Sequence, residues 1–389
     1  MVPAFLPFPP DATLTPDEQA VLDRVTALAR DVIEPGAEGW ELDRRFAREA
    51  FEAAGAAGLT GVLAPRDQGG ESLGTVALAR MFEEIASADL AVSFILVVHN
   101  NLVGNMMRNG TEAMKAEVLP DLIAGRRLGA FLLTEPDFGS DAAAIGCRAT
   151  RDGNTWVIDG RKAWVTNASD ADVLSVYAQI DPALGHRGII AFIVDANAPG
   201  VVREEPYEML GAHAMGTGGF RFEGVRVTDE DVLVPLGSAF RAAMEGIDLA
   251  RVVVGAMCCG MLQKGLDVAL DRTADRHLFG SSVADKQGIQ WMLADVATDL
   301  EASRLLTYRA ARLLADGGDA TMAAAHAKKF AARAAQKGLA DCMQTLGAAG
   351  FRRDPGNPLP RHLAGARLSH YIDGTTEIQN VVIARRLWA

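Results

Sequence analysis

Two segments of the 389-residue chain carry residue types that suit a ligand with an aromatic ring and phosphate groups. The first is Leu133–Asp141, with the sequence LTEPDFGSD. A Gly/Ser loop after a strand brings backbone N–H groups and hydroxyls onto ring acceptors or phosphate, and Gly139, without a Cβ, permits close approach. Taken alone, the segment is equally consistent with an ordinary Pro-Gly turn.

The second segment is Asp275–Gly280, with the sequence DRHLFG. The planar guanidinium of Arg276 suits a diphosphate better than a lysine would. The alternative is a structural arginine at a helix C-terminus, where its positive charge interacts favourably with the helix macrodipole and a glycine caps the helix. Further along, Gln344–Phe351 (QTLGAAGF) has small residues that would let a ligand or another backbone come close, or would simply pack helices tightly.

Two more segments contain polar groups beside aromatic or glycine residues. Trp164–Asn167 (WVTN) combines a ring with a hydroxyl, although a core tryptophan in a strand would look the same. His370–Gln379 (HYIDGTTEIQ) places Asp373 before Gly374. Asp-Gly is common in turns, so Asp373 is either a turn residue or a carboxylate with a chemical role.

Several common classes of protein are disfavoured. The chain has no GxGxxG after a strand and no GxxxxGK[ST], GxSxG or HExxH motif, which argues against a Rossmann enzyme, a P-loop NTPase, an α/β-hydrolase and a zincin. The seven histidines show no i,i+4 pair, so no metal site is expected. The cysteines lack metal or redox spacing, and we expect reduced core thiols in a cytoplasmic protein: Cys147, Cys258, Cys259 and Cys342.

Charge and hydropathy argue against several classes of binding partner. A net charge of −12 without a basic stripe argues against nucleic acid or anionic lipid. The apolar run from Leu90 to Val98 is far shorter than the ~20 residues that a bilayer requires, so no membrane span is expected. Met1–Pro10 has no basic leader and is rich in proline, which is unlike a secretory signal.

The chain divides into a helical region (1–127), a strand-rich region (128–235) and a second helical region (236–389). Thr15-Pro16-Asp17-Glu18 predicts a capped helix start. Asp152-Gly153 predicts a hairpin. Ile289, Leu293, Val296 and Leu300 predict the apolar face of a helix. Short strands are expected at 131–134, 155–158, 173–177, 189–194 and 220–222. The predicted fold class is α+β and multidomain: helices, a β-barrel or sandwich, and a helical bundle.

In this order, the five segments resemble the acyl-CoA dehydrogenase family across nearly the whole chain. The resemblance implies FAD as cofactor and α,β-dehydrogenation of an acyl-CoA thioester, with Trp164 and Thr166 at the flavin ring. It also implies a homotetramer, because Arg276 and Phe279 would hold the FAD pyrophosphate and adenine across a subunit boundary. The residues that the resemblance assigns to FAD are Phe131, Leu133, Thr134, Gly139, Ser140, Trp164, Thr166, Arg276, Phe279, Gln344, Gly347, Thr375 and Glu377.

The resemblance also assigns the catalytic base. Family members carry a Glu-Gly-Thr run whose carboxylate removes the α-proton, and Asp373 stands at that position here. The thioester oxygen would accept a hydrogen bond from the Asp373 N–H and from a ribityl hydroxyl of FAD. Asp withdraws the carboxylate by roughly 1.5 Å, and a misplacement on the order of 1 Å lowers a rate about 100-fold. Its pKa must also rise above ~3.9 for it to work near neutrality.

Two other positions in the sequence could in principle hold the catalytic base. Another branch of the family has its base one residue before a helix arginine, but that residue here is Ala250, before Arg251. Glu377 lies four residues after Asp373, yet the resemblance assigns it to the flavin side. Asp373 is therefore the predicted catalytic residue.

The acyl group is expected to be short, branched or alicyclic. Some branches that act on alicyclic thioesters also carry Asp at the base position, and the apolar pocket offers no partner for a distal charge. The residues expected around the substrate are Ser140, Phe94, Ile95, Val98, Leu102, Arg251, Val253, Val254, Ile372 and Gly374, with Ser140 near the pantetheine–phosphate region of coenzyme A.

The compact chain favours an electron-transferring flavoprotein as the electron acceptor. A carrier-protein thioester dehydrogenase, an enoyl-CoA reductase and a desulfinase-type enzyme stay open. A flavin monooxygenase or nitroso-forming enzyme would not need an acidic residue in the Gly-Thr loop. A non-catalytic FAD-containing interaction protein is the alternative of another class.

Overall fold

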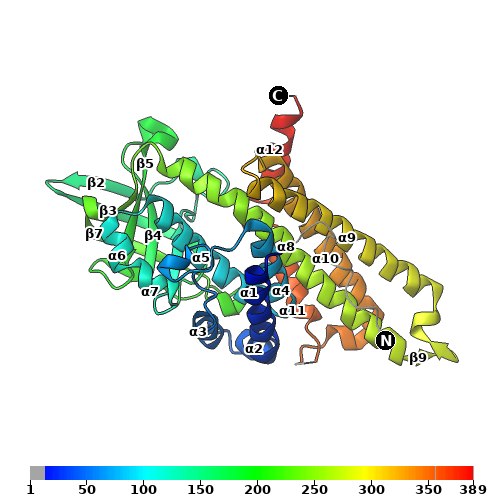
Figure 1. Cartoon of the computed structure of the whole chain (residues 1–389). Helices are drawn as coiled ribbons and strands as arrows, with labels where there is room; N and C mark the ends of the chain where they lie inside the picture. Colours follow the sequence, from blue (N-terminus) through cyan, green and yellow to red (C-terminus); the bar gives the residue numbers. More distant parts are fainter. Residues whose placement is uncertain (1–13, 355, 389) are drawn as a thin grey trace.

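The computed structural model describes residues 14–354 and 356–388, so Met1–Pro10 lies outside the described residues. Figure 1 shows N-terminal helices, a sheet on one side of the molecule and long C-terminal helices on the other. The predicted order of a helical region, a sheet region and a second helical region is confirmed.

The N-terminal region is helical because its capping and apolar periodicity agree. Thr15 caps the first helix and forms the predicted capping box with Glu18, and Pro16 occupies the first turn. The chain passes through a π-helical turn at Ala29–Ile33 directly into the second helix. The helices are α1 (Pro16–Leu28), α2 (Glu34–Leu42), α3 (Arg48–Ala56), α4 (Thr75–Ala88), α5 (Leu90–Asn109), α6 (Glu112–Glu117) and α7 (Leu119–Ile123).

The middle region is one eight-stranded sheet with the order β6-β7-β3-β2-β4-β5-β8, and β1 pairs with β4 in parallel. The predicted Asp152-Gly153 hairpin joins β2 to β3, with Gly153 at a φ of +60°. The strands are β1 (Gly129–Leu132), β2 (Arg148–Asp152), β3 (Thr155–Val165), β4 (Val173–Gln179), β5 (Ile189–Asp195), β6 (Val201–Arg203), β7 (Gly218–Thr228) and β8 (Val232–Val234).

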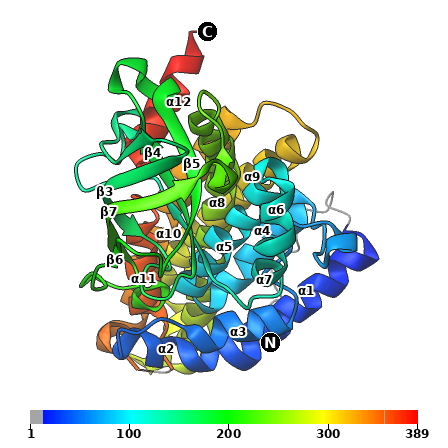
Figure 2. The ribbon, with the colours of Figure 1, turned by 90° about the vertical axis from the view of Figure 1, so that its left-hand side faces the viewer.

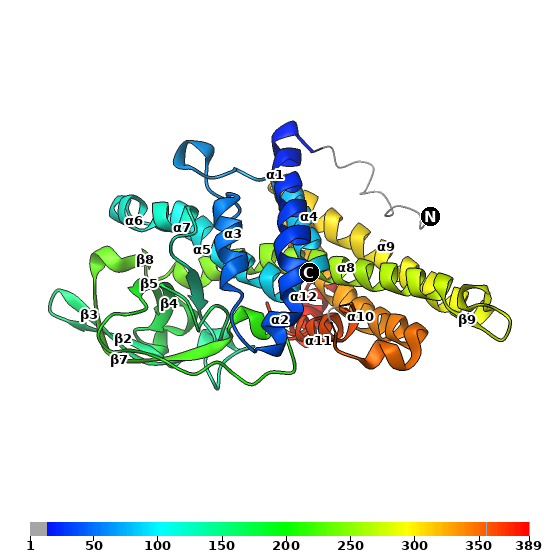
Figure 3. The ribbon, with the colours of Figure 1, turned by 90° about the horizontal axis from the view of Figure 1, so that it is seen from below.

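The C-terminal region is built on three long helices, the first two of which are joined by a small β-hairpin. The predicted apolar face of α9 is confirmed, since Leu293, Val296 and Leu300 are buried. Figures 1 and 3 place the β9-β10 hairpin at the end of the molecule farthest from the sheet. The elements are α8 (Ala239–Asp275), β9 (His277–Leu278), β10 (Ser281–Ser282), α9 (Gln287–Ala315), α10 (Thr321–Leu346), α11 (Leu359–Leu368) and α12 (Thr376–Leu387).

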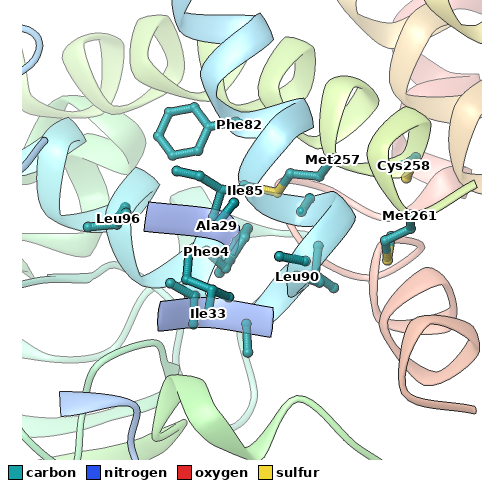
Figure 4. Close-up of a cluster of buried hydrophobic side chains, with 14 of the residues drawn as sticks. Ala29, Ile33, Phe82, Ile85, Leu90, Phe94, Leu96, Met257, Cys258 and Met261 are labelled. Atoms are coloured by element: carbon teal, nitrogen blue, oxygen red, sulfur yellow. The ribbon is translucent and has the colours of Figure 1, made fainter. Parts of the chain in front are cut away.

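A continuous apolar core joins the two helical regions. Figure 4 shows Phe94 of α5 beside Ile33, and Met257, Cys258 and Met261 of α8 in the same cluster. Figure 2 shows the N-terminal helices beside the sheet, where Leu102 and Met106 of α5 belong to a second cluster. All four cysteines are buried and free, as expected for core thiols.

Two helices, α5 and α8, are long and apolar enough to cross a bilayer by length and composition. In each, 83% of the apolar window is buried inside the protein. Their apolar surface is therefore used by the core.

A buried ion pair ties the end of β1 to β3. Lys162 Nζ donates to Glu135 Oε1 at 2.8 Å and to the Leu133 carbonyl at 2.9 Å, and both side chains are buried. The same carboxylate accepts from the backbone N–H groups of Gly146 (2.6 Å) and Cys147 (2.9 Å). This pair fixes the chain on both sides of the loop that follows β1, because each partner is satisfied only in this arrangement.

We expect Lys162→Met to lower the free energy of unfolding by about 3–5 kcal/mol, because it leaves a buried carboxylate without its countercharge. Urea unfolding followed by circular dichroism measures the loss. The matched control is Arg161→Met on the same strand, where the exposed pair with Glu204 is screened by water and the loss should be much smaller. Equal losses in the two variants would contradict this account of the buried pair.

Candidate active site

Asp373 lies in the short loop between α11 and α12, in an unusual backbone conformation. Its φ is +50°, a left-handed value that is uncommon outside glycine, and Gly374 follows with a φ of +83°. The loop is closed by the Thr376 N–H, which donates to the His370 carbonyl at 3.0 Å. Thr375 then caps α12 by accepting from the Ile378 N–H at 3.3 Å.

Three side chains from three helices hold the carbonyl groups of this loop. Arg251 of α8 donates from Nε to the Asp373 carbonyl at 3.3 Å. Lys328 of α10 donates from Nζ to the Gly374 carbonyl at 2.6 Å. Gln379 of α12 donates to the same Gly374 carbonyl at 2.7 Å. Buried hydrogen-bond donors on the protein side of the loop therefore stabilise the left-handed turn.

The Asp373 carboxylate is partly buried, and its Oδ2 is shielded from solvent without a hydrogen-bond partner among the described residues. Desolvation raises the pKa of Asp373 to about 6, against the opposing effects of Lys328 and Arg251. Within the described chain, the Asp373 N–H has no hydrogen-bond acceptor. The loop thus presents a carboxylate poised near neutrality next to a free backbone donor.

The other two positions considered for the base are unsuitable in this geometry. Glu377 is exposed, and hydrogen bonds from its own backbone N–H and from Thr375 lower its pKa. Ala250 is buried beside Arg251 and has no acidic group.

The segment around Thr134 and the segment around Trp164, which the resemblance assigns to the flavin ring, lie side by side. The Ala163 N–H donates to the Thr134 carbonyl at 3.0 Å. Trp164 has a φ of +58° and is 61% exposed, with its ring edge-on to Tyr207 at a centroid distance of 4.8 Å. Thr166 is buried close by in sequence. A large aromatic side chain that is exposed to solvent beside hydroxyl groups suits a ligand with an aromatic ring that stacks on it.

The remaining residues of the β1 end are arranged around this site. Leu133 is buried, whereas Phe131 is partly buried and packs edge-on against Tyr177 at 5.1 Å. Gly139 and Ser140 are exposed in the following loop. Nothing but Thr134 Cγ2, at 3.8 Å, lies near a Cβ placed on Gly139, so a ligand has room to approach.

A third group of predicted residues surrounds Arg276 at the far end of α8. Arg276 Nη1 donates to the Leu346 carbonyl at 3.1 Å. Gly347 has a φ of +63°, and a Cβ on it would lie 3.1 Å from the same Nη1. Gln344 is exposed nearby in sequence, and Phe279 is 97% exposed at the hairpin tip with a φ of +53°.

The apolar residues predicted for the acyl pocket are mostly buried in the core. Val98 and Ile372 are only partly buried and pack against the main apolar cluster. The fully buried ones are Phe94, Ile95, Leu102, Val253 and Val254. Among the described residues, no cluster of His, Cys, Asp and Glu could hold a metal ion.

Lys328 and Gln379 are not among the site residues predicted from the sequence. A signal for Lys328 was present: Ala324, Ala331 and Ala335 share its face of α10 at helical spacing, and all three are buried. A lysine on an apolar face is rarely buried without a specific partner, so that position was a candidate functional site. Gln379 had no such signal, because its contacts depend on the loop geometry.

Family models of the acyl-CoA dehydrogenase N-terminal, middle and C-terminal domains match residues 15–126, 130–225 and 237–388. The chain is 34% identical over 364 residues to a probable acyl-CoA dehydrogenase, fadE25, of Mycobacterium leprae, covering 93% of each chain. It is 35% identical to the mitochondrial short-chain specific acyl-CoA dehydrogenase of Bos taurus, covering 89% of this chain and 84% of that one. The chain therefore belongs to the acyl-CoA dehydrogenase family.

Solved structures agree with this assignment. Butyryl-CoA dehydrogenase from Megasphaera elsdenii aligns with a TM-score of 0.93 at 29% identity, covering 97% of this chain and 100% of that one. A structure from work on the electron transferring flavoprotein of Acidaminococcus fermentans gives 0.93 at 32%, covering 97% and 99%. A glutaryl-CoA dehydrogenase from Mycobacterium smegmatis in complex with FADH2 gives 0.90 at 27%, covering 96% and 95%.

The protein is a flavoprotein oxidoreductase of acyl-CoA metabolism that acts on CH–CH bonds, with FAD as its cofactor. Its own residues fit that cofactor. Trp164 is exposed beside a hydroxyl-bearing segment that suits the flavin ring. Arg276 lies against a glycine whose missing Cβ leaves space for a diphosphate.

Proposed function

We propose that the protein dehydrogenates a short, branched or alicyclic acyl-CoA thioester at its α,β-bond, with Asp373 as the catalytic base. One observation carries the proposal: a shielded carboxylate with a pKa of about 6 stands at the family's base position. A base is most effective when its pKa lies near the working pH, and burial has moved Asp373 toward that range.

In this proposal the chain's residues bind the thioester, orient it and accept the α-proton. When bound, FAD supplies the acceptor for the β-hydride. The Asp373 N–H, which has no acceptor in the described chain, is available to the thioester oxygen, where negative charge develops as the α-proton leaves. Arg251 and Gln379 hold the loop carbonyls so that this donor does not need to reorganise.

Packing around the predicted acyl pocket supports a compact substrate. Phe94, Ile95 and Val254 are buried in the core, so a long alkyl chain would have to displace side chains that are already close-packed. The similarity to a short-chain specific enzyme and to a butyryl-CoA dehydrogenase favours the same conclusion. The shorter Asp373 side chain leaves additional room next to a branched or ring α-carbon.

The proposal includes two partners and a location. The structure from work on an electron transferring flavoprotein supports a flavoprotein of that kind as the electron acceptor. The second partner is another copy of the chain, which completes the FAD site in the proposed assembly. Four buried free thiols are consistent with the reducing cytoplasm.

The FAD residues form two groups, one at the sheet and one around Arg276. The distance between these groups supports an assembly of several chains, such as a homotetramer. Ala239 and Ala243 at the start of α8 pack in the same cluster as Tyr177 and Val234 of the sheet region, whereas Arg276 follows the end of α8. Arg251, which contacts the Asp373 loop, lies about 25 residues before Arg276, roughly 38 Å along the helix at 1.5 Å per residue, which is farther than one FAD can span. A flavin that uses both groups must therefore take one from a neighbouring chain.

We expect Arg276→Ala to weaken FAD retention about 10- to 100-fold and to loosen chain association at the same time. The reason is that a charge-assisted hydrogen bond contributes roughly 1.5–3 kcal/mol. Fluorescence titration of the apoprotein with FAD and sedimentation velocity measure the two effects. Arg272→Ala, one helical turn earlier, is the control. Unchanged FAD affinity would show that Arg276 has been misplaced.

Asp373→Asn tests the catalytic role directly. Asn keeps the size and the turn but cannot accept the proton, so anaerobic flavin reduction should slow at least ~100-fold while FAD content is retained. In the wild type, reduction should be fast above pH 6 and fall as pH drops through about 6, because the base is then protonated. Asp23→Asn, at an exposed position of α1, should retain both the rate and the profile. Wild-type rates in Asp373→Asn with every thioester would remove Asp373 as the base.

Asp373→Glu tests why the base is short. If the pocket accommodates a bulky α-carbon, the longer carboxylate should slow branched or alicyclic thioesters through crowding and spare or improve straight-chain ones. The measurement is the ratio of kcat/KM for cyclohexanecarboxyl-CoA to that for butyryl-CoA in the two proteins. A ratio that does not fall in the variant would rule out this explanation of the short base.

A further inference from the structure

Lys328 is a charged side chain placed where charge is difficult to accommodate. It lies on the alanine face of α10, is fully buried, and forms no ion pair with any described residue. Its Nζ donates at 2.6 Å to the Gly374 carbonyl, 46 positions along the chain. Burying an ammonium is strongly unfavourable unless the charge has a specific partner.

The charges that face Lys328 and Asp373 come from three segments, namely α8, the loop itself and α12. Arg251 and its partner Asp248 belong to α8, where Cys258 also faces the lysine. His370 lies in the loop itself, and the exposed Glu377 follows on α12. Of the groups that favour the charged form of Lys328, Asp373 has the largest effect, and of the charges that favour ionised Asp373, Lys328 is the largest.

We infer that Lys328 is a positioning residue for the proposed base: it anchors the carbonyl of Gly374, the residue that follows Asp373, and so holds a buried positive charge against the Asp373 loop. The inference rests on the proposed role of Asp373. Lys328 touches the loop backbone rather than substrate, so it acts through Asp373. It balances the desolvation that the loop imposes on the carboxylate, which keeps the base ionised at neutral pH.

Asp373 and Lys328 each favour the charged form of the other. Burial raises the pKa of Asp373 to about 6 and lowers the pKa of Lys328 to about 8. Between these values both are charged and attract each other. Once the lysine charge is removed, Arg251 is the opposing charge that remains among the described residues, so the carboxylate should gain its proton at a higher pH.

The test is the titration of Asp373 in the FAD-loaded protein, followed by infrared difference spectroscopy with Asp373→Asn as the blank. In Lys328→Met the midpoint should move up by about one pH unit or more. Flavin reduction should then slow more at pH 6 than at pH 8. Lys328→Arg should return the midpoint toward that of the wild type, and Lys329→Met, on the adjacent residue, should leave it unchanged. An unchanged midpoint in Lys328→Met would overturn the inference.

A second measurement does not depend on a Lys328 variant that folds. In the wild type with ¹³C-labelled lysine, the Lys328 side-chain signal should shift as Asp373 titrates near pH 6, and that shift should be missing in Asp373→Asn. A chemical shift of the Lys328 side chain that does not change near pH 6 in the wild type would overturn the inference. Neither measurement uses turnover, so they remain interpretable if Asp373→Asn keeps its reduction rate and the proposed function fails instead.

Discussion

The arrangement of the C-terminal helices depends on one constraint: a carboxylate must be withdrawn from water and still remain ionisable. Asp373 meets it in a left-handed turn whose carbonyl groups would otherwise lack donors. Arg251, Lys328 and Gln379 supply those donors from α8, α10 and α12. The three helices therefore have to approach one another closely at this point, and small residues permit it.

Close approach of the helices is visible in their glycines. A Cβ on Gly338 of α10 would lie 2.6 Å from Leu262 of α8, and one on Gly255 would lie 2.7 Å from Thr307 of α9. The alanine-rich composition of α10 has the same effect along its length. A side chain at Gly338 would push α10 away from α8, so the packing of small residues helps to bring together the two helices that carry Lys328 and Arg251.

Much of the local structure could be predicted from the sequence, because it depends on neighbouring residues. The capping box at Thr15 and the Asp152-Gly153 hairpin follow from turn and cap chemistry, and the buried face of α9 follows from helical periodicity. The long-range contacts could not be predicted in this way. Periodicity shows that Lys328 faces the core, but not that Gly374 will be its acceptor. The Lys162–Glu135 pair likewise depends on how β1 lies against β3.

The candidate site was predictable to different degrees for a related reason. Asp373 and Trp164 could be assigned because their segments resemble a family in order and spacing. What the resemblance does not supply is the pKa of Asp373, which depends on desolvation and on two cations from other helices. Desolvation by the loop raises the pKa of Asp373, and Lys328 of α10 and Arg251 of α8 oppose that rise. The pKa of this carboxylate therefore depends on how two other helices pack against the loop, and the local sequence around Asp373 does not contain that information.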